Sequence, residues 1–572
     1  MGTPSPLSSR ATRRRAQRLL LLSAVAFLLT AFAVACWVLP CRAALAPNGG
    51  LYGFSVIPDE FAYAWRMQPL ITGATTANVV NRFHDPAVIS PFFLEDFVRG
   101  MLTVTGLPVA WMFWIWRFAF PLALAAAVWV AAGACLAVRR RPWSQPLRCA
   151  ASLGGVGALY VLSHLTSGTG DIALYLDRIP TNLEYPLAFL LAWAWLRLAA
   201  APSVRRGMVL ACLGALLVYL RPYAVIPWGT AIALHLLYRI VRQTLPHKTW
   251  LDAAGTLVVL LAPWLAIAYH NSQSPVYAQM YARYYSQWPY QVHPRWAVHL
   301  GAAALLAAMA WRVARDRRAM LTCMAATAAA LPFISGLFRE AQELLLFERY
   351  GSFYVVALVA GAMLVLDEEA NRRHGKLAAG FARRAAGACF ILSLGSSGAL
   401  SVWHSQYDFE HNPWTQLRSL SEDRQYIPSY QWIARHTPAD AFFLVDDGID
   451  WSVVPPSSQV MISHYAPDGA ELYQRGDYFQ LLARRQRVFN EWLWAFALSD
   501  GQYIELAALQ RGTFGYPIPV EDYKAFLKRY RPGYVFWRRK APVPRGYGKQ
   551  LSALAEVVYS DAVCEVWRLK YE

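Results

Sequence analysis

The segment Arg13-Arg14-Arg15-Ala16-Gln17-Arg18 stands directly before an uncharged, mainly apolar run from Leu19 to Leu39. About 20 apolar residues are enough to cross the hydrocarbon core of a bilayer. The run is too long for the hydrophobic region of a signal peptide and lacks a clean small-x-small cleavage site, so we interpret it as a retained span. Because basic residues beside a first span stay in the cytoplasm, the segment predicts a membrane protein with its N-terminus inside.

The composition of the whole chain agrees with this interpretation. Of 572 residues, 56% are hydrophobic and only 16% are charged, which is typical of a polytopic membrane protein. The net charge of +18 could indicate a nucleic-acid partner, but the basic residues form short clusters between apolar runs, as cytoplasmic loops do. We therefore expect no nucleic-acid binding. The eight cysteines include no CxxC pair and predict neither a disulfide framework nor a zinc site.

Placing the Arg and Lys clusters on one side of a membrane gives about eleven helical spans. The predicted spans are Leu19–Leu39, Arg117–Val138, Cys149–Leu165, Tyr185–Ala200, Gly207–Leu220, a sixth reaching Leu237, a seventh reaching Tyr269, Trp296–Trp311, Met320–Leu337, Gly351–Leu366 and Ala386–Trp403. This count leaves the N-terminus in the cytoplasm and the C-terminus outside. The abundance of Ala, Arg and Trp favours a bacterial inner membrane.

The chain divides into a transmembrane part, residues 1–403, and an extracytoplasmic part, residues 404–572, in which the composition becomes polar. Residues 40–110 form a large first outer loop, whose amphipathic piece Phe92–Leu102 is expected to lie along the membrane surface. Short strands are predicted at Ala441–Val445, Val460–Ser463, Tyr534–Trp537 and Cys564–Trp567, and helices at Ser429–His436, Tyr478–Phe489 and Val520–Tyr530. The second part should therefore be a small α/β domain.

The carboxylate pair Asp59 and Glu60 lies in the first outer loop, within Ile57-Pro-Asp-Glu-Phe-Ala-Tyr-Ala-Trp65. Aromatic side chains such as those around the pair can stack on a sugar face. A carboxylate that is partly desolvated near a membrane surface can accept a proton from an attacking hydroxyl. A solvated pair without a function is the alternative interpretation.

Four arginines are expected at the outer ends of spans. They are Arg178, Arg221, Arg339 and Arg349. A guanidinium group binds phosphate through both its charge and paired hydrogen bonds, whereas simple anchoring to lipid headgroups is the competing explanation. Arg221 is the most suggestive because the short fifth span would leave its side chain near the membrane surface.

Three sequence features together resemble the GT-C superfamily of membrane glycosyltransferases. They are the acidic pair Asp59-Glu60 in the first outer loop, the turn Leu216-Leu-Val-Tyr-Leu-Arg221-Pro222 after a short span, and Trp432–Asp440 placed before the strand Phe442–Val445. The many-span layout with an outer C-terminal domain also fits. This superfamily includes protein O-mannosyltransferases, the aminoarabinose transferase of lipid A and arabinosyltransferases.

The resemblance implies transfer of a sugar, with inversion, from a polyprenyl-phosphate donor to a lipid, polysaccharide or protein acceptor. Asp59 would be the general base, and Glu60 would orient the acceptor. Some relatives use a divalent metal such as Mg²⁺ or Mn²⁺, and Asp171 or Asp177 could join Asp59 at such a site. Tyr284 and Tyr285 belong to a tyrosine-rich outer loop that could line the acceptor entrance.

Two other functions remain open at this stage. A transporter or flippase for a lipid-linked intermediate would carry charged residues well inside its spans and an internal repeat with broken helices. A non-catalytic partner of an envelope assembly complex would tolerate loss of the acidic pair, which is intact here. The chain contains no P-loop, HExxH or GxSxG motif, which favours a lipid-linked donor over a nucleotide sugar.

Overall fold

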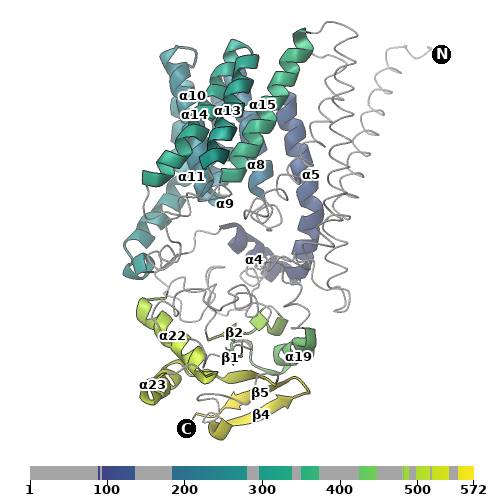
Figure 1. Ribbon diagram of the computed structural model, residues 1–572, viewed down its shortest axis with the longest axis vertical. Helices are drawn as coiled ribbons and strands as arrows, with labels where there is room; N and C mark the ends of the chain where they lie inside the picture. Colours follow the sequence, from purple (N-terminus) through teal and green to yellow (C-terminus); the bar gives the residue numbers. More distant parts are fainter. Residues whose placement is uncertain are drawn as a thin grey trace, which may run out of the picture.

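The computed structural model describes residues 88–89, 93–107, 109–135, 183–279, 296–337, 350–372, 424–446, 479–480, 482–488, 498–515, 518–539 and 552–571. Within these ranges the chain forms a bundle of long helices and, below it in Figure 1, a five-stranded sheet flanked by helices. The predicted spans Leu19–Leu39, Cys149–Leu165 and Ala386–Trp403 lie outside the described residues, so the total of eleven spans stays a prediction.

The other eight predicted spans coincide with helices of the bundle. These helices are α5 (Val109–Cys135), α8 (Glu184–Ala200), α9 (Val204–Leu220), α10 (Val225–Val241), α11 (His247–Ser272), α13 (Trp296–Arg312), α14 (Arg315–Leu337) and α15 (Gly351–Arg372). Several of them exceed the expected bounds; helix α14, for example, begins at Arg315, before the predicted Met320. Helix α5 begins before the predicted Arg117, and α15 continues beyond Leu366 because Asp367-Glu-Glu-Ala contains no helix breaker.

Helix α11 is the clearest membrane-spanning candidate. In the part of the chain that the structure describes, α11 and the first 19 residues of α15 are long and apolar enough to cross a membrane. No residue in the apolar window of α11 is fully buried, and Val259 is 72% exposed. Because so large an exposed apolar surface is unfavourable in water, α11 is suited to a hydrocarbon environment.

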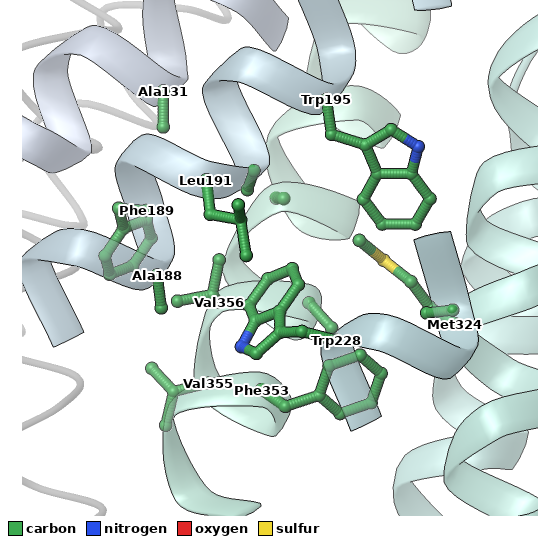
Figure 2. Packing of buried hydrophobic residues seen from close by; sticks show 14 of the residues in the cluster. Ala131, Ala188, Phe189, Leu191, Trp195, Trp228, Met324, Phe353, Val355 and Val356 are labelled. Atoms are coloured by element: carbon green, nitrogen blue, oxygen red, sulfur yellow. The ribbon is translucent and has the colours of Figure 1, made fainter. Parts of the chain in front are cut away.

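Large aromatic side chains fill the centre of the bundle. Figure 2 shows Trp228 of α10 packed against Phe353 of α15, with the ring centroids 5.3 Å apart and the rings nearly perpendicular. Gly361 allows α15 to approach α13, since a Cβ atom there would lie only 2.7 Å from Sδ of Met309. Helix α15 is therefore the buried central element, whereas α11 lies on the outside.

The strands form a mixed sheet of order β2-β1-β3-β5-β4. The strands are β1 (Phe442–Val445), β2 (Gln486–Arg487), β3 (Tyr534–Arg538), β4 (Ala555–Ser560) and β5 (Cys564–Leu569). β1 pairs in parallel with β2 and β3, whereas β5 pairs antiparallel with β3 and β4. The predicted strands at Ala441–Val445, Tyr534–Trp537 and Cys564–Trp567 are thereby confirmed, while Val460–Ser463 lies outside the described residues.

Helices cover both faces of this sheet. They are α19 (Ile427–His436), α22 (Asp500–Thr513) and α23 (Val520–Tyr530). On one face, Tyr430 of α19 packs against Phe536 and shares a buried cluster with Phe443, and on the other, Leu506 of α22 shares a buried cluster with Leu444. The sheet with helices on its two faces is the α/β architecture expected for residues 404–572, whereas the boundary at residue 404 stays a prediction.

The prediction of a helix over Tyr478–Phe489 is wrong in its second half. Residues 479–480 and 482–483 are helical, but Gln486–Arg487 forms β2. Arg484 between them has φ of 53°, a left-handed conformation that ends a right-handed helix. The chain therefore leaves the helix at Arg484 and enters the sheet.

Helix α4 (Phe93–Thr105) lies between the bundle and the sheet in Figure 1. Val98 and Leu102 on one side of α4 are buried in the same cluster as Tyr430 and Phe536 of the sheet region. Phe97, Met101 and Val104 lie about 100° around the helix from this buried side. They are apolar and exposed, and Val104 is 87% exposed. This arrangement agrees with the amphipathic helix expected at Phe92–Leu102.

Candidate functional site

The candidate site is a buried ion pair at the end of the bundle that lies toward the sheet. Glu184, the first residue of α8, forms an ion pair with Arg221 at the end of α9, with 3.2 Å between Nε of Arg221 and Oε2 of Glu184. The hydroxyl of Ser352, in the first turn of α15, donates to the other oxygen of Glu184. Glu184 is 5% exposed and Arg221 8%. Three helices thus bring one acid, one base and one hydroxyl together.

The local sequence explains why Arg221 occupies this position. Pro222 follows it, and a residue before proline is disfavoured in the helical region. Arg221 accordingly has extended backbone angles (φ −152°, ψ 85°), while its N–H still donates to the carbonyl of Leu217 at 2.8 Å. Helix α9 therefore ends at Arg221, and the chain turns through Pro222–Ala224 into α10.

Helix dipoles favour both charges where they lie. The N-terminus of a helix carries partial positive charge and stabilises a carboxylate, and the C-terminus stabilises a cation. Glu184 lies at the start of α8, where Pro186 fits the first turn because it needs no hydrogen-bond donor there, and Arg221 caps the end of α9. The pair is therefore supported by its own two helices as well as by mutual attraction.

A second polar contact ties α15 to α13. His299 Nδ1 and the hydroxyl of Tyr354 share a hydrogen bond, and both side chains are buried. Tyr354 follows Ser352 by two residues, which places the two side chains about 200° apart around α15. Helix α15 is therefore fixed near its first turns to α8 on one side and to α13 on another.

The ion pair lies close in the chain to apolar side chains that the protein leaves exposed. Leu216, five residues before Arg221, is 53% exposed, and Val225, four residues after it, is 43% exposed. Exposed apolar residues on membrane helices face lipid chains.

The end of the first outer loop is fixed to the same end of the bundle. The side-chain amide of Asn271, the penultimate residue of α11, accepts from the N–H of Ile89 at 3.0 Å and donates to its carbonyl at 2.8 Å. Asn271 is buried, and the two residues are 182 positions apart in the chain. Nearby along the chain, Gln279 accepts from the N–H of Asp500 in α22 at 3.1 Å. The segment after α11 thus contacts both the first outer loop and the sheet region.

Among the residues that the sequence singled out, the structure describes Arg221. It lies at the turn that follows α9, after the predicted fifth span, and its side chain is buried against Glu184. The remaining candidates, Asp59, Glu60, Arg178, Arg339, Arg349, Asp171, Asp177, Tyr284 and Tyr285, lie outside the described residues, and their roles stay predictions. The described ranges contain no cluster of three or more His, Cys, Asp or Glu residues that could hold a metal ion.

The predicted fourth span began at Tyr185 and so left out Glu184, and sequence reasoning gave Ser352 no role. Glu184 instead begins α8 and is buried. A lone acid immediately before a long apolar run, with proline two residues later, is a signal for a helix start that could have placed it. The contact with Ser352 joins residues 168 positions apart, and no local pattern indicates it.

A separate polar cluster lies beside the sheet, at the turn between β4 and β5. Asp561 accepts from the hydroxyls of Tyr559 and Ser429 and from the backbone N–H groups of Val563 and Cys564. Burial alone would raise the pKa of Asp561, but these hydrogen bonds outweigh it and hold the pKa below its usual value. Burial raises the pKa of the Cys564 thiol to about 12, so this thiol is protonated and unsuited to nucleophilic attack. The cluster fixes a turn and offers no catalytic nucleophile.

No family model and no curated protein matches the chain. Among solved structures, the chain is similar to the crystal structure of ArnT from Cupriavidus metallidurans in the apo state, with a TM-score of 0.47 and 14% sequence identity. The similarity covers 97% of this chain and 98% of that chain. A likeness at this level assigns neither a family nor a function.

Proposed function

We propose that the protein is an integral-membrane glycosyltransferase of the GT-C type, which transfers a sugar from a polyprenyl-phosphate donor to an extracytoplasmic acceptor with inversion. The observation that carries the proposal is the Glu184–Arg221 pair, which holds a guanidinium group at the sheet-facing end of the bundle and a few residues along the chain from exposed apolar side chains. The sequence resemblance in the acidic pair and around Arg221 supports it.

The donor binds through its lipid and its phosphate. Its prenyl tail lies against the apolar flank that includes Leu216 and Val225, and Arg221 contacts the phosphate. Negative charge grows on this phosphate as the sugar leaves, so a fixed cation is most valuable there. Arg178, Arg339 and Arg349 are proposed as further cations for the same group.

The acceptor reacts through a hydroxyl. Asp59 removes the proton of this hydroxyl while its oxygen attacks the anomeric carbon from the face opposite the phosphate. The new carbon–oxygen bond forms as the bond to the phosphate oxygen breaks, and polyprenyl phosphate leaves. Glu60 orients the acceptor, and Tyr284 and Tyr285 line its entrance. No step of this scheme requires a metal ion.

The proposal includes a location and an orientation. The protein spans the bacterial inner membrane many times, with its N-terminus in the cytoplasm. Residues 404–572 lie on the extracytoplasmic side with the first outer loop. A lipid, polysaccharide or protein acceptor would reach the site from there.

A second candidate function, transport of a lipid-linked intermediate, is favoured by one observation. Within the bundle, Nε1 of Trp195 donates to Nδ1 of His235 at 2.9 Å, and His235 is buried. Ionisable residues inside a membrane bundle often mark a transport route. The catalytic test separates the two functions because a transporter leaves the sugar–phosphate bond intact.

The test measures release of polyprenyl phosphate by purified protein in detergent, with short-chain polyprenyl-phosphate sugars as donors. We expect release by the wild type and a loss of at least about 100-fold in Asp59→Asn, the usual scale of lost acid–base catalysis. Asp252→Asn, which changes a carboxylate in the first turns of α11, is the matched control and should release product normally. A parallel assay with EDTA shows whether Mg²⁺ or Mn²⁺ contributes. Intact donor bound without release, or normal turnover by Asp59→Asn, would refute the proposed mechanism.

A further inference from the structure

The guanidinium group proposed to bind the donor phosphate already has an anionic partner. Glu184 contacts Arg221 at Nε, and both side chains are buried. A carboxylate and a phosphate attract a guanidinium group by the same charge and the same hydrogen bonds. The two anions therefore compete for Arg221.

The geometry suits an exchange between these anions. The Arg221–Glu184 contact measures 3.2 Å, longer than the 2.7 Å between Arg317 Nη1 and Asp367 Oδ2 in the partly buried pair that joins α14 and α15 at the opposite end of the bundle. Short charge-assisted contacts measure about 2.7–2.9 Å. Ser352 donates to the second oxygen of Glu184, so the carboxylate keeps a hydrogen bond when its contact with Arg221 is lost. The longer contact, Arg221–Glu184, is thus the one whose carboxylate has another hydrogen-bond partner, Ser352.

We infer that Glu184 is a displaceable counter-ion, which holds Arg221 in position until the donor phosphate takes its place. This inference rests on the proposed function. After transfer, the carboxylate competes with the phosphate of the remaining polyprenyl phosphate and promotes its release. Glu184 is a positioning residue, because it acts on the substrate through Arg221.

Removal of the carboxylate then has a defined signature. In Glu184→Gln the phosphate no longer competes with this carboxylate for Arg221, so the protein should bind short-chain polyprenyl phosphate about tenfold more tightly than the wild type. Tighter product binding should lower KM and also lower kcat, because release becomes slow. If Glu184 only stabilised the fold, the variant would bind the phosphate equally or more weakly.

The experiment measures binding of short-chain polyprenyl phosphate to full-length protein in detergent, together with the rise in thermal stability that the ligand causes. The matched control is Asp367→Asn, which removes a buried carboxylate from the pair with Arg317. Glu184→Gln should be less stable than the wild type without ligand and should gain more stability when ligand is added. Asp367→Asn should lose stability and keep wild-type affinity.

Further arms identify the ligand group and guard against misfolding. Polyprenol without phosphate should bind equally to Glu184→Gln and the wild type. Inorganic phosphate should bind more tightly to Glu184→Gln than to the wild type, but more weakly than polyprenyl phosphate does.

Glu184→Asp keeps the charge one methylene farther from Arg221 and should show an intermediate gain in affinity if Glu184→Gln does not fold. Wild-type or weaker binding of polyprenyl phosphate by the folded variants overturns the inference.

Binding and turnover are read separately, so the two proposals can fail independently. Tighter binding in Glu184→Gln without sugar release by the wild type would reject the glycosyltransferase function and keep the counter-ion. Sugar release by the wild type without tighter binding in the variants would keep the glycosyltransferase function and reject the counter-ion.

Discussion

A single buried guanidinium group carries most of the site that the structure describes. Arg221 and Glu184 compensate each other's charge inside an apolar bundle, where a lone ion would be strongly disfavoured. The two residues should therefore depend on each other for stability as well as for function.

Arg221→Gln should destabilise the protein by about 3–5 kcal/mol, because it leaves the carboxylate of Glu184 buried without this cation. The double variant Arg221→Gln/Glu184→Gln removes both charges and should recover much of that loss. Thermal and denaturant unfolding of the four proteins in detergent forms a double-mutant cycle that measures the coupling. Additive effects of the two changes would show that the ion pair contributes nothing.

A second residue-scale prediction concerns pH and Asp561. Its pKa is lower in the folded protein than the usual value, so ionised Asp561 contributes stability above the usual pKa, about 4. This contribution should be lost as the pH falls through that value towards the lower pKa of the folded state. Unfolding of the sheet region followed between pH 7 and pH 2 should show the loss, and Asp561→Ala should abolish this part of the pH dependence. An unchanged pH profile in the variant would contradict the assignment.

At the scale of elements, helix α4 has a buried side and an exposed apolar side. Val98 and Leu102 face the sheet region, while Phe97, Met101 and Val104 form an exposed apolar stripe. Because α4 lies between the bundle and the sheet, the stripe is placed to lie in the membrane interface.

A spin label on Val104→Cys in liposomes should accordingly be more accessible to lipid-soluble oxygen than to a water-soluble nickel chelate. The same label on Thr103→Cys, an exposed neighbour about 100° around the helix, is the control and should show the opposite preference. Equal accessibility at both positions would place α4 in water.

Residues that begin or end helices explain much of how well the helix bounds were predicted from the sequence. Pro222 ends α9 at Arg221, and the predicted fifth span stops correctly at Leu220. Helix α22 was missed although Ser499 and Gln502 form a capping box, a pattern that is visible in the sequence. The turn at Arg484 could not be predicted, because arginine rarely adopts positive φ and only the surrounding packing imposes it.

The site was less predictable than the helices. The sequence identified Arg221 from its place at a span end, but its partners come from α8 and α15, and pairing between distant segments follows from packing of the whole bundle. A local pattern gives the type of an element and its ends, whereas contacts such as Glu184–Ser352 depend on the tertiary arrangement.

At the scale of the whole molecule, the proposed orientation places the two ends of the helix bundle on opposite sides of the membrane. Gln243, in the turn between α10 and α11, and Lys524, in α23 beside the sheet, are both exposed. A membrane-impermeant maleimide should label Lys524→Cys once the outer membrane is opened, and Gln243→Cys only after the inner membrane is permeabilised. The wild-type protein gives the background from its native cysteines, and labelling of both positions from one side would reject the orientation.

The ion pair also bears on how the chain is made. Helices α8 and α9 are separated only by residues 201–203, so they form an antiparallel hairpin whose two far ends carry Glu184 and Arg221. Helix α15 is synthesised more than 100 residues later, which means that Ser352 is absent when the hairpin leaves the ribosome. The carboxylate and the guanidinium can neutralise each other within the hairpin at once. A newly made chain can thus insert both charges in a single step, without waiting for the rest of the bundle.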